Sequence, residues 1–514
     1  MGNASRQGSL KPPPSLTEVV TRTRASLHRQ PRYDVIVIGG GITGAGIARE
    51  SARRGWRTLL LERDDFAGGT SSVSSKMVHG GLRYLAQGQW RLTREAAQQR
   101  EALVHRWPDL ITPTPYYYLY QPNDWRQRIA LPICLMLYHW LSGAPSHHRP
   151  SHHDAEALRG RFAPLALPDH SQAWQYYDAL CDDSALVLRT LQEAAVHGAE
   201  LSHYTPVTGL LRRQGNVCGV CVRIAEQEKP LEASMVINAT GVWADALAPL
   251  PPGCRLRPLR GSHLMFHRRD LPLAAALTLH HPKDNRVVFC YPWRGHSVIG
   301  TTDLDHLADK SEPARMSSAE RDYLMALLPQ LGLKTDLPVL ASWSGLRPIL
   351  QPLNTKQTPS SASREHLVWE ESGLVNITGG KLTTFVPMAD ETLALAESQG
   401  RLPAARPAED QVLGPPRLEP GTAIGDSDIQ DSTLSYWAEH GAIVQLADLL
   451  VRRTRLAWTL GPDLERFQGP IRTACQKQLG WSDSHWQAQW QGMLAQSCSA
   501  EYAASETGPM TLSR

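Results

Sequence analysis

The sequence predicts an α/β fold in which a dinucleotide-binding unit comes first, an antiparallel sheet follows and helices end the chain. Near the N-terminus a glycine-rich turn lies between two short apolar runs, which is the pattern of a β-α-β unit. Strand-like runs separated by turn residues occupy the stretch from about residue 260 to 303. After about residue 431, apolar residues recur at three- and four-residue spacing and indicate helices. A length of 514 residues allows two or three such domains.

The N-terminal unit starts with "YDVIVI", Tyr33 to Ile38, a β-branched run of the kind that forms a buried parallel strand. Three glycines of the G-x-G-x-x-G pattern follow, and a helix is predicted to run to about Arg54. Gly39 permits a tight turn, Gly41 lets the backbone approach a pyrophosphate, and Gly44 lets the helix pack closely on the strand. The free N–H groups at the start of this helix favour phosphate binding.

A second strand, "RTLLLE", ends in Glu62, about 20 residues beyond the glycines. A carboxylate at this place accepts hydrogen bonds from a ribose diol and disfavours a 2′-phosphate, so NADP is not expected. The fingerprint alone leaves NAD and FAD open.

Small residues and hydroxyls follow the acid, in "RDDFAGGTSSVSSKMVHGGLRYL". An extended dinucleotide could bond to these groups, although a solvated serine-rich loop would have the same composition. Gly80 and Gly81 favour the first interpretation, because two glycines let the backbone approach a flat ring.

The composition excludes several classes of protein. The net charge is +3 and the chain has no dense basic run, so no nucleic-acid partner is expected. Eight cysteines are thinly spread, which fits a reducing compartment. The close pair, Cys218 and Cys221, lies in a strand-like run where residues three apart point to opposite faces.

Four other segments receive structural interpretations. The apolar run Ile129 to Leu141 contains Pro132 and is too short to span a membrane; we expect a core helix, with a lipid-surface patch as the alternative. Residues 1–31 are expected to be a disordered tail, and a mitochondrial presequence is left open. We expect the arginines of "VRRTR" to lie on a solvated helix face. The histidine-rich "SHHRPSHH" is read as a mobile loop and not as a metal site, and no metal is predicted elsewhere.

Several motifs occur together and in order: "GGGITGAGIA", "TSSVSSKMVHGGLRYL", "GSHLMF", "VIGTTDLD", "WSGLRPIL", "SREHLV" and "TGGKLTTF". With them the chain resembles the FAD-dependent, respiratory glycerol-3-phosphate dehydrogenases, within the amine and amino-acid oxidase-like flavoproteins. The resemblance covers roughly residues 33 to 395 and continues more loosely toward the C-terminus. The proline-rich N-terminal tail and residues 403–433 depart from the pattern, and no EF-hand loop follows.

The resemblance implies a discontinuous, Rossmann-like FAD-binding domain, an antiparallel substrate-domain sheet and a C-terminal helical domain. We expect FAD-binding parts at 32–115, 176–250 and 341–400, a substrate or cap insertion at 116–175, and the substrate sheet at 251–340. A linker at 401–430 would lead to helices at 431–500. "LEASMVINATG" and "LVNITGGKLTTF" would be strands that return to the dinucleotide sheet, and the second would face the flavin with free N–H groups. The implied FAD contacts are Gly39, Gly41, Gly44, Glu62, Thr70, Ser71, Ser75, His79, Gly80, Gly81, Val207, Gly241, Gly379, Gly380, Lys381, Leu382 and Thr383.

Oxidising a phosphorylated secondary alcohol requires a proton acceptor and fixed cations for the phosphate. We assign His263 as the base, with His79 as the second candidate, and expect Arg347 and Lys381 to be catalytic. A lysine after two glycines at a helix start opposes the helix dipole, which suits a residue that serves an anion. The predicted substrate-binding residues are Arg83, Arg364 and Thr301.

The resemblance implies oxidation of sn-glycerol 3-phosphate to dihydroxyacetone phosphate, with hydride transfer to flavin N5 and electrons passed to a membrane quinone. It places the protein peripherally on the cytoplasmic face of the inner membrane, or in the cytoplasm, and leaves a homodimer open. Three alternatives remain: an oxidase that uses oxygen, a related flavin oxidase of amines or amino acids, and a non-catalytic FAD-binding protein.

Overall fold

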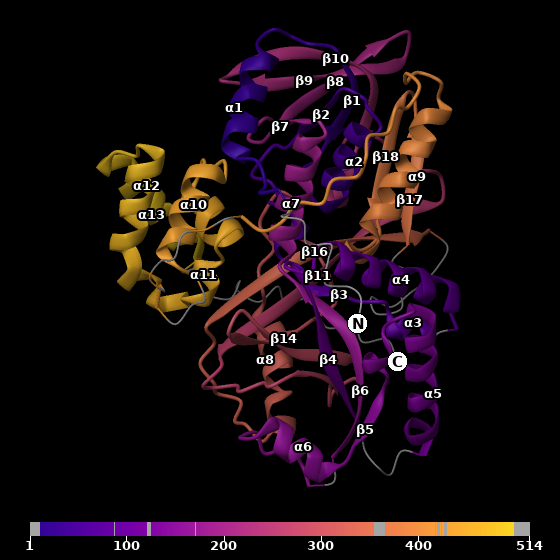
Figure 1. Ribbon diagram of the computed structural model, residues 1–514, viewed down its shortest axis with the longest axis vertical. Coiled ribbons are helices and arrows are strands. Elements are labelled where there is room, and N and C mark those ends of the chain that lie inside the picture. The colour runs from indigo at the N-terminus through magenta and orange to yellow at the C-terminus, as the bar shows by residue number, and fades with distance from the viewer. Residues whose placement is uncertain are drawn as a thin grey trace.

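The structure is a computed structural model that describes residues 11–86, 88–120, 125–169, 171–353, 365–416, 418, 422, 424–425 and 429–497. Figure 1 shows three parts: a first sheet with its helices at the top, a second sheet below it, and a group of C-terminal helices at one side. The predicted combination of a parallel dinucleotide sheet, a second sheet and C-terminal helices is confirmed.

The first sheet has the strand order β17-β18-β10-β1-β2-β7. Its strands are β1 (Tyr33–Ile38), β2 (Thr58–Leu61), β7 (Glu200–Ser202), β10 (Gln227–Asn238), β17 (His366–Glu371) and β18 (Leu374–Gly379). All neighbours along this path are parallel except β17 and β18, and both predicted returning strands, β10 and β18, are present. Helices α2 (Ile42–Arg53), α7 (Asp183–Val196) and α9 (Phe385–Ser398) pack on one another beside the sheet. Burial of β1 from Val35 to Ile38 and of the whole of β2 explains the apolar runs of these two strands.

A β-ribbon extends from the first sheet. It is formed by β8 (Val207–Arg213) and β9 (Asn216–Ile224), and β9 also pairs with β10. Cys218 and Cys221 lie on β9 as free cysteines, so their interpretation as strand residues is confirmed.

The second sheet has the order β15-β11-β14-β13-β12-β4-β6-β3, with β16 paired to β11 and β5 to β6. The bounds are β3 (Met77–Val78), β4 (Ile111–Tyr120), β5 (Ser151–His153), β6 (Gln172–Cys181), β11 (Cys254–His267), β12 (Ala276–His280), β13 (Val287–Trp293), β14 (His296–Gly300), β15 (Leu304–Asp305) and β16 (Ala341–Pro352). The pairs are antiparallel except β12 with β4. Helix α6 (Ala155–Phe162), helix α8 (Ser318–Met325) and the short turn η4 (Leu328–Leu331) contribute to the core of this domain.

The predicted domain boundaries cut across this sheet. We assigned residues 341–400 to the FAD-binding domain, but β16 pairs with β11 along its whole length, from Ala341 to Pro352. We also separated 116–175 as an insertion, whereas β4 and β6 are paired strands of the second sheet. Local sequence patterns predict that these segments are strands, but they do not predict how the strands pair. The paired strands lie more than 50 residues apart in sequence.

The N-terminal segment is not wholly a disordered tail as expected. Helix α1 (Leu16–Leu27) is capped by the Ser15 hydroxyl, and it buries Leu16, Val19, Val20 and Leu27. These residues lie on one helix face and pack into the cores around β1, so tertiary contacts order the segment.

The C-terminal helices form their own core, as predicted. They comprise α10 (Asp431–His440), the π-helical turn η6 (Asp448–Arg453), α11 (Leu456–Thr459), η7 (Gly461–Phe467), α12 (Gln468–Leu479) and α13 (Asp483–Ser497). The expectation of solvated arginines is wrong, because the side chains of Arg453 and Arg455 are fully buried and that of Arg452 nearly so. Their guanidinium groups bind buried aspartates of the first domain, which sequence separation concealed.

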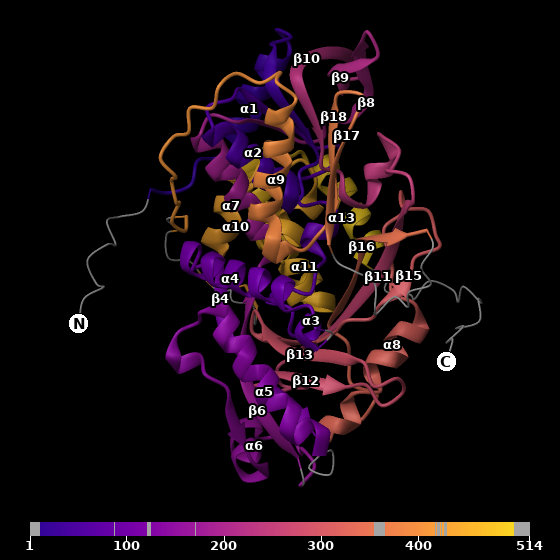
Figure 2. The same cartoon turned by 90° about the vertical axis from the view of Figure 1, so that its right-hand side faces the viewer.

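The apolar run beginning at Ile129 forms helix α5 (Trp125–Ser142), which lies beside α3 (Leu82–Ala86) and α4 (Trp90–Arg106). Figure 2 shows α5 on the outside of the molecule. The expected core helix is wrong for one whole face, because five large apolar side chains on it are exposed. No helix among the described residues is long and apolar enough to cross a membrane.

The histidine-rich segment is ordered, in contrast to the predicted mobile loop. The turn η2 (Ser146–His148) precedes β5, which pairs with β6. The His148 ring stacks on Tyr177 with centroids 4.1 Å apart. Neighbouring aromatic side chains therefore hold these histidines.

Candidate active site

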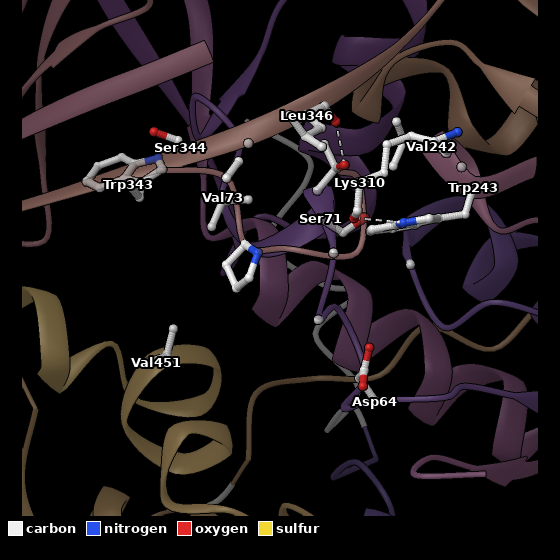
Figure 3. Close-up of a pocket in the computed structure, with 18 of the residues that line it drawn as sticks. Asp64, Ser71, Val73, Val242, Trp243, Lys310, Trp343, Ser344, Leu346 and Val451 are labelled. Carbon is white, nitrogen blue, oxygen red and sulfur yellow. Dashed lines mark hydrogen bonds between the residues drawn. The ribbon is translucent and has the colours of Figure 1, made fainter. Parts of the chain in front are cut away.

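A cavity of about 1070 Å³ lies where the two sheets and the C-terminal helices meet (Figure 3). Its walls come from the turn after β1, parts of the segment 61–73, the turn η3 (Gly241–Ala246), β16 and the residues after β18. The C-terminal domain adds Val451, Trp458 and Met493. A volume at the upper end of ordinary ligand sites suits a large, extended cofactor.

The glycine-rich turn is built so that nothing larger than glycine fits. A Cβ on Gly39, whose φ is +113°, would lie 2.6 Å from the carbonyl oxygen of Ala239. A Cβ on Gly44 would lie 1.9 Å from the carbonyl oxygen of Gly39. Gly41 is the N-cap of α2 and faces the cavity. The turn therefore brings backbone N–H groups to the cavity wall, where a pyrophosphate can accept their hydrogen bonds.

Glu62 lies beside this turn at the end of β2 and lines the cavity. Its carboxylate accepts hydrogen bonds from the N–H of Gly40 at 2.6 Å and of Asp64 at 2.9 Å. Burial raises the pKa of Glu62, and these two N–H groups act in the opposite direction. The carboxylate is thus held in place at the position that the sequence predicted for a ribose-binding acid.

The hydroxyl segment closes the other side of the turn. Ser71 Oγ accepts a hydrogen bond of 3.0 Å from the N–H of Ile42, at the start of α2. Thr70 Oγ1 donates to the carbonyl of Leu346 on β16 at 2.6 Å, which ties the first domain to the second sheet (Figure 3). Both hydroxyl residues line the cavity.

The segment after β18 meets the His79–Gly81 segment, as the sequence predicted. Thr383 Oγ1 lies 3.2 Å from both the N–H and the carbonyl oxygen of His79. Gly380 has a φ of +75°, and a Cβ there would lie 2.4 Å from the sulfur of Met388. Two glycine-rich segments far apart in sequence therefore lie side by side near one end of the cavity.

Most predicted FAD contacts line the cavity, and the others support its walls. Those that line it are Gly39, Gly41, Glu62, Thr70, Ser71, Val207, Gly241, Gly379, Gly380, Lys381 and Leu382. Those that do not are Gly44, Ser75, His79, Gly80, Gly81 and Thr383. Of the second group, Thr383 holds His79, and Ser75 contacts the predicted base.

His263 lies on β11 with only 1% of its surface exposed. Its Nε2 is 2.9 Å from Ser75 Oγ, and its ring stacks on Trp343 at 5.1 Å between centroids. Its Nδ1 has no hydrogen-bond partner among the described residues. Burial, then the charges of Arg347 and Lys76, lower the pKa of His263 well below its usual value. The imidazole is therefore neutral near pH 7 and can accept a proton.

Arg347 occupies a hollow formed by small residues on the same face of the sheet. A Cβ on Gly261 would lie 2.3 Å from its guanidinium nitrogens. The guanidinium donates to Thr301 Oγ1 at 2.7 Å and to Asp303 Oδ1 at 3.1 Å. Thr301 and Asp303 are thus partners of Arg347, and the structure brings Thr301, Arg347 and His263 into one region.

Lys381 follows β18 by two residues and lines the cavity. Its Nζ is 3.8 Å from the ring centroid of Tyr84, a residue of α3 that is 6% exposed. The neighbouring Arg83 is exposed and does not line the cavity. Arg364 lies outside the described residues.

Sequence reasoning missed three aromatic residues of the site. Tyr84 contacts Lys381, Trp343 supports His263 and lines the cavity, and Trp243 also lines the cavity (Figure 3). The motifs "LRYL", "WSGLRP" and "TGVWAD" contain all three. Each of the three lies within four residues of a predicted arginine or glycine, and this proximity in sequence was the available signal.

The fold and the site together define the class of protein, which is an oxidoreductase. Its glycine-rich turn suits an adenine dinucleotide, and its paired glycine segments beside the second sheet suit a flat ring. The glycine cradle, the fixed Glu62 carboxylate and the paired glycine segments fit FAD. A family model described as FAD dependent oxidoreductase matches residues 34–420. The chain belongs to this family, and FAD is its cofactor.

Individual proteins of known name resemble the chain in sequence or in fold. The chain is 34% identical over 378 residues to the aerobic glycerol-3-phosphate dehydrogenase of Bacillus subtilis, covering 71% of this chain and 67% of that protein. The Staphylococcus epidermidis protein of the same name is also 34% identical, over 379 residues and the same shares. The fold matches that of the FAD complex of Bacillus halodurans glycerol-3-phosphate dehydrogenase with a TM-score of 0.70 at 22% identity, over 93% of this chain and 96% of that one. It also matches the L-α-glycerophosphate oxidase of Mycoplasma pneumoniae with a TM-score of 0.60 at 16% identity, over 76% and 100%.

Proposed function

We propose that the protein oxidises sn-glycerol 3-phosphate to dihydroxyacetone phosphate. The observation that carries this proposal is the pairing of a neutral, buried imidazole with an arginine in a glycine-lined hollow, His263 and Arg347. An alcohol needs the first group and a phosphate needs the second. The names of the curated relatives support the same substrate.

The chain's residues would divide the chemistry between them. FAD, when bound, supplies a two-electron acceptor for the hydride that leaves C2 of the alcohol. His263 would take the hydroxyl proton, so that the substrate loses one hydride and one proton. The hydrogen bond of Ser75 and the stacking of Trp343 would fix the orientation and position of the imidazole ring. Because this histidine is buried, nearby charges have a strong influence on its proton affinity.

Arg347 would bind the substrate phosphate with its planar fork. Thr301 and Asp303 would orient the guanidinium, because both accept its hydrogen bonds. Lys381 would add a second cation from the cavity lining, where Tyr84 supports its ammonium. A doubly charged phosphate gains more from such cations than a carboxylate does, which favours glycerol 3-phosphate over an amino acid.

Alanine variants of Arg347 and Lys381 test this assignment. Each should retain FAD but slow the bleaching of the flavin by sn-glycerol 3-phosphate at least about 100-fold, the effect expected when a buried charged contact is lost. A non-catalytic FAD-binding protein would show no bleaching even as wild type. An amino-acid oxidase would be bleached by an amino acid and not by the phosphate.

We further propose that electrons pass to a quinone at a membrane surface to which the protein binds peripherally. Helix α5 supports this, because its outer face is apolar at the helical spacing i, i+4, i+7, i+8 and i+11. The exposed side chains are Ile129 (59%), Ile133 (64%), Met136 (44%), Leu137 (39%) and Trp140 (75%). Such a patch is unusual on a free surface and suits insertion into a lipid interface.

Basic and aromatic side chains lie on the same and neighbouring elements. Arg128 on α5 is exposed, as are Trp90, which is 50% exposed, and Arg91 on α4. Arginines beside an apolar helix face attract anionic lipid headgroups, and tryptophan favours the headgroup level. The exposed arginine of α5 therefore adds a positive charge beside the apolar side chains of the same helix, which favours a lipid surface over a purely apolar protein partner.

Co-sedimentation with vesicles that contain phosphatidylglycerol tests the membrane proposal. The double variant Ile133→Asp, Trp140→Asp should bind at least about tenfold more weakly, because two inserted apolar side chains become charged. The control Leu307→Asp changes an apolar residue elsewhere in the molecule that is even more exposed, at 86%, and should bind like the wild type. Equal binding of all three proteins would contradict the proposal. A wild-type dimer that the double variant dissociates would assign the face to a second copy instead.

The acceptor itself can be tested separately. Under argon, a soluble quinone should restore turnover with sn-glycerol 3-phosphate, while oxygen alone should support it much more slowly. Fast oxygen consumption without quinone would favour the oxidase alternative.

A further inference from the structure

We propose that Lys76 is a positioning residue that couples the C-terminal helical domain to the predicted base, His263. This inference rests on the proposed function, because it concerns how the base of that reaction is held and tuned. Lys76 lies in the segment that precedes the glycine pair of the first domain, and it does not touch the cavity.

Lys76 is fully buried and ionically bonded. Its exposure is 0%, and its Nζ donates to both carboxylate oxygens of Asp183, at 2.9 and 2.7 Å. The same ammonium donates to the carbonyl of Ser72 at 2.5 Å. Asp183 in turn accepts from the N–H and hydroxyl of Ser74, at 3.0 and 2.7 Å. One lysine–aspartate pair therefore fixes the backbone from residue 72 to 76.

Three tryptophans surround the ammonium. Its Nζ lies 5.6 Å from the ring centroid of Trp293, 5.2 Å from Trp343 and 4.7 Å from Trp458. Trp293 and Trp343 belong to strands of the second sheet, and Trp458 belongs to α11 of the C-terminal domain. A cation so placed is attracted by all three ring faces. The lysine is thus the point at which three parts of the chain meet.

Two direct connections lead from this point to His263. The residue next to Lys76, Ser75, places its hydroxyl 2.9 Å from His263 Nε2. Trp343, one wall of the cage, stacks on the His263 ring at an interplanar angle of 12°. Trp343 also stacks on Trp458, at 4.8 Å and 9°. His263, Trp343 and Trp458 therefore form a continuous stack from the second sheet into the C-terminal domain.

A second charged link comes from the C-terminal domain. Arg455 donates to Asp182 Oδ1 at 2.8 Å, to the carbonyl of Ser72 at 3.1 Å and also to Asp183. Arg294 of the second sheet shares Asp182 at 3.1 Å. The cluster thus contains three cations and two carboxylates, and the ammonium of Lys76 is the member nearest the tryptophan stack.

A purely structural role does not explain a charge in this place. Replacing buried ion pairs by apolar residues of similar size is often neutral or stabilising. A methionine would fill a cage of three tryptophans well, and Asp183 would keep Arg455 and Ser74 as partners. What methionine cannot supply is a positive charge close to His263, which helps to keep the imidazole neutral.

The charged and titratable groups around the two residues fix the expected sign. Facing His263 are the cations Arg347 and Lys76, and both lower its pKa in addition to burial. Facing Lys76 are Asp183, Asp182 and Arg455, together with Cys181. Burial lowers the pKa of Lys76 to about 8, against the opposite influence of Asp183. Assays below about pH 7.5 therefore keep Lys76 charged.

The experiment compares Lys76→Met, Lys76→Arg and the control Lys477→Met, which changes an exposed lysine of α12. Flavin bleaching by sn-glycerol 3-phosphate is followed anaerobically from pH 5 to 7.5, and amide exchange of residues 72–79 is measured by mass spectrometry. In Lys76→Met the bleaching rate should fall by about 100-fold, as expected for a displaced catalytic group. The acidic limb of the pH–rate profile of Lys76→Met, where the bleaching rate falls with decreasing pH, should move to higher pH. The reason is that a base without the nearby cation is protonated more readily.

Several results separate the outcomes. Lys76→Arg should keep the wild-type acidic limb, and Lys477→Met should match the wild type in every measurement. Amide exchange of residues 72–79 should be faster only in Lys76→Met, whatever the substrate proves to be. An unshifted acidic limb and unchanged exchange in Lys76→Met would overturn the inference. A wild-type protein that does not bleach would instead overturn the proposed function, while the exchange data would still test the role of Lys76.

Discussion

One of the buried charged contacts that attach the C-terminal domain to the dinucleotide domain is made by Asp65. Its side chain is 1% exposed, and Arg453 donates to its two oxygens at 2.6 and 2.7 Å. Arg452 bonds to the same carboxylate. We predict that Asp65→Asn strongly destabilises the C-terminal domain, because the fully buried guanidinium of Arg453 would lose its counter-charge, whereas Arg452 would keep Asp448 as a partner.

The expected size follows from burial. Removing one partner of a buried, hydrogen-bonded ion pair costs about 3–5 kcal/mol, whereas an exposed pair contributes at most about 1 kcal/mol. The exposed pair Arg159–Asp169, 2.9 Å apart with side chains 54% and 89% exposed, provides the matched control. Asp169→Asn should change the unfolding free energy by less than about 1 kcal/mol.

Urea unfolding with saturating FAD, followed by tryptophan fluorescence, measures both variants. Trp486 and Trp490 report on the C-terminal domain, because both are buried in its core. Its transition should move by about 3 kcal/mol or more in Asp65→Asn. Equal transitions for Asp65→Asn and Asp169→Asn would refute the reasoning.

The same contact has a predictable pH dependence. Burial alone would raise the pKa of Asp65, but the charges of Arg453 and Arg452 lower it well below its usual value. A carboxylate with a depressed folded-state pKa stabilises the fold above its unfolded pKa, near 4. This stabilisation should be lost as the pH falls below that value, and Asp65→Asn should show a smaller acid-induced loss than the wild type.

Three further predictions concern the cavity and its walls. Gly44→Ala should abolish FAD binding, because the new Cβ would lie 1.9 Å from a backbone oxygen. The loss would be measured as missing absorbance near 450 nm. The control Gly160→Ala, which has open space around it, should retain the flavin. Tyr138→Phe should lower stability by about 1–3 kcal/mol in thermal unfolding, because its buried hydroxyl donates to Asp178 at 2.6 Å and accepts from the Gly80 N–H at 2.8 Å. Arg347→Lys should raise KM for the phosphate substrate by about tenfold in steady-state assays, since it keeps the charge but loses the planar fork; an unchanged KM would place the phosphate elsewhere.

The sequence was sufficient where local chemistry decides the structure. The apolar run of β1 from Val35 to Ile38, the glycine pattern and Glu62 are consequences of backbone approach and helix packing within about 30 residues. The meeting of His79 with Thr383 was predicted from two glycine-rich segments, although only the resemblance to known flavoproteins indicated that they would be neighbours.

The sequence could not predict contacts between residues that are far apart in the chain, and it could not predict which face of a helix is exposed to solvent. The spacing of apolar residues in α5 fits a core helix as well as an exposed one, and only the packed structure shows which face has no cover. Arg453 looked solvated because its carboxylate partner, Asp65, lies 388 residues away in sequence. The burial of Lys76 was hidden for the same reason, since the tryptophans around it come from three separate segments.

The central claim is that this FAD-dependent oxidoreductase acts on glycerol 3-phosphate, and one spectrum tests it most directly. The visible absorbance of the purified protein should be recorded anaerobically before and after addition of sn-glycerol 3-phosphate. We predict that the protein is yellow and that its flavin band bleaches with this compound and not with glycerol or an amino acid. A yellow protein that keeps its band in the presence of sn-glycerol 3-phosphate would contradict it.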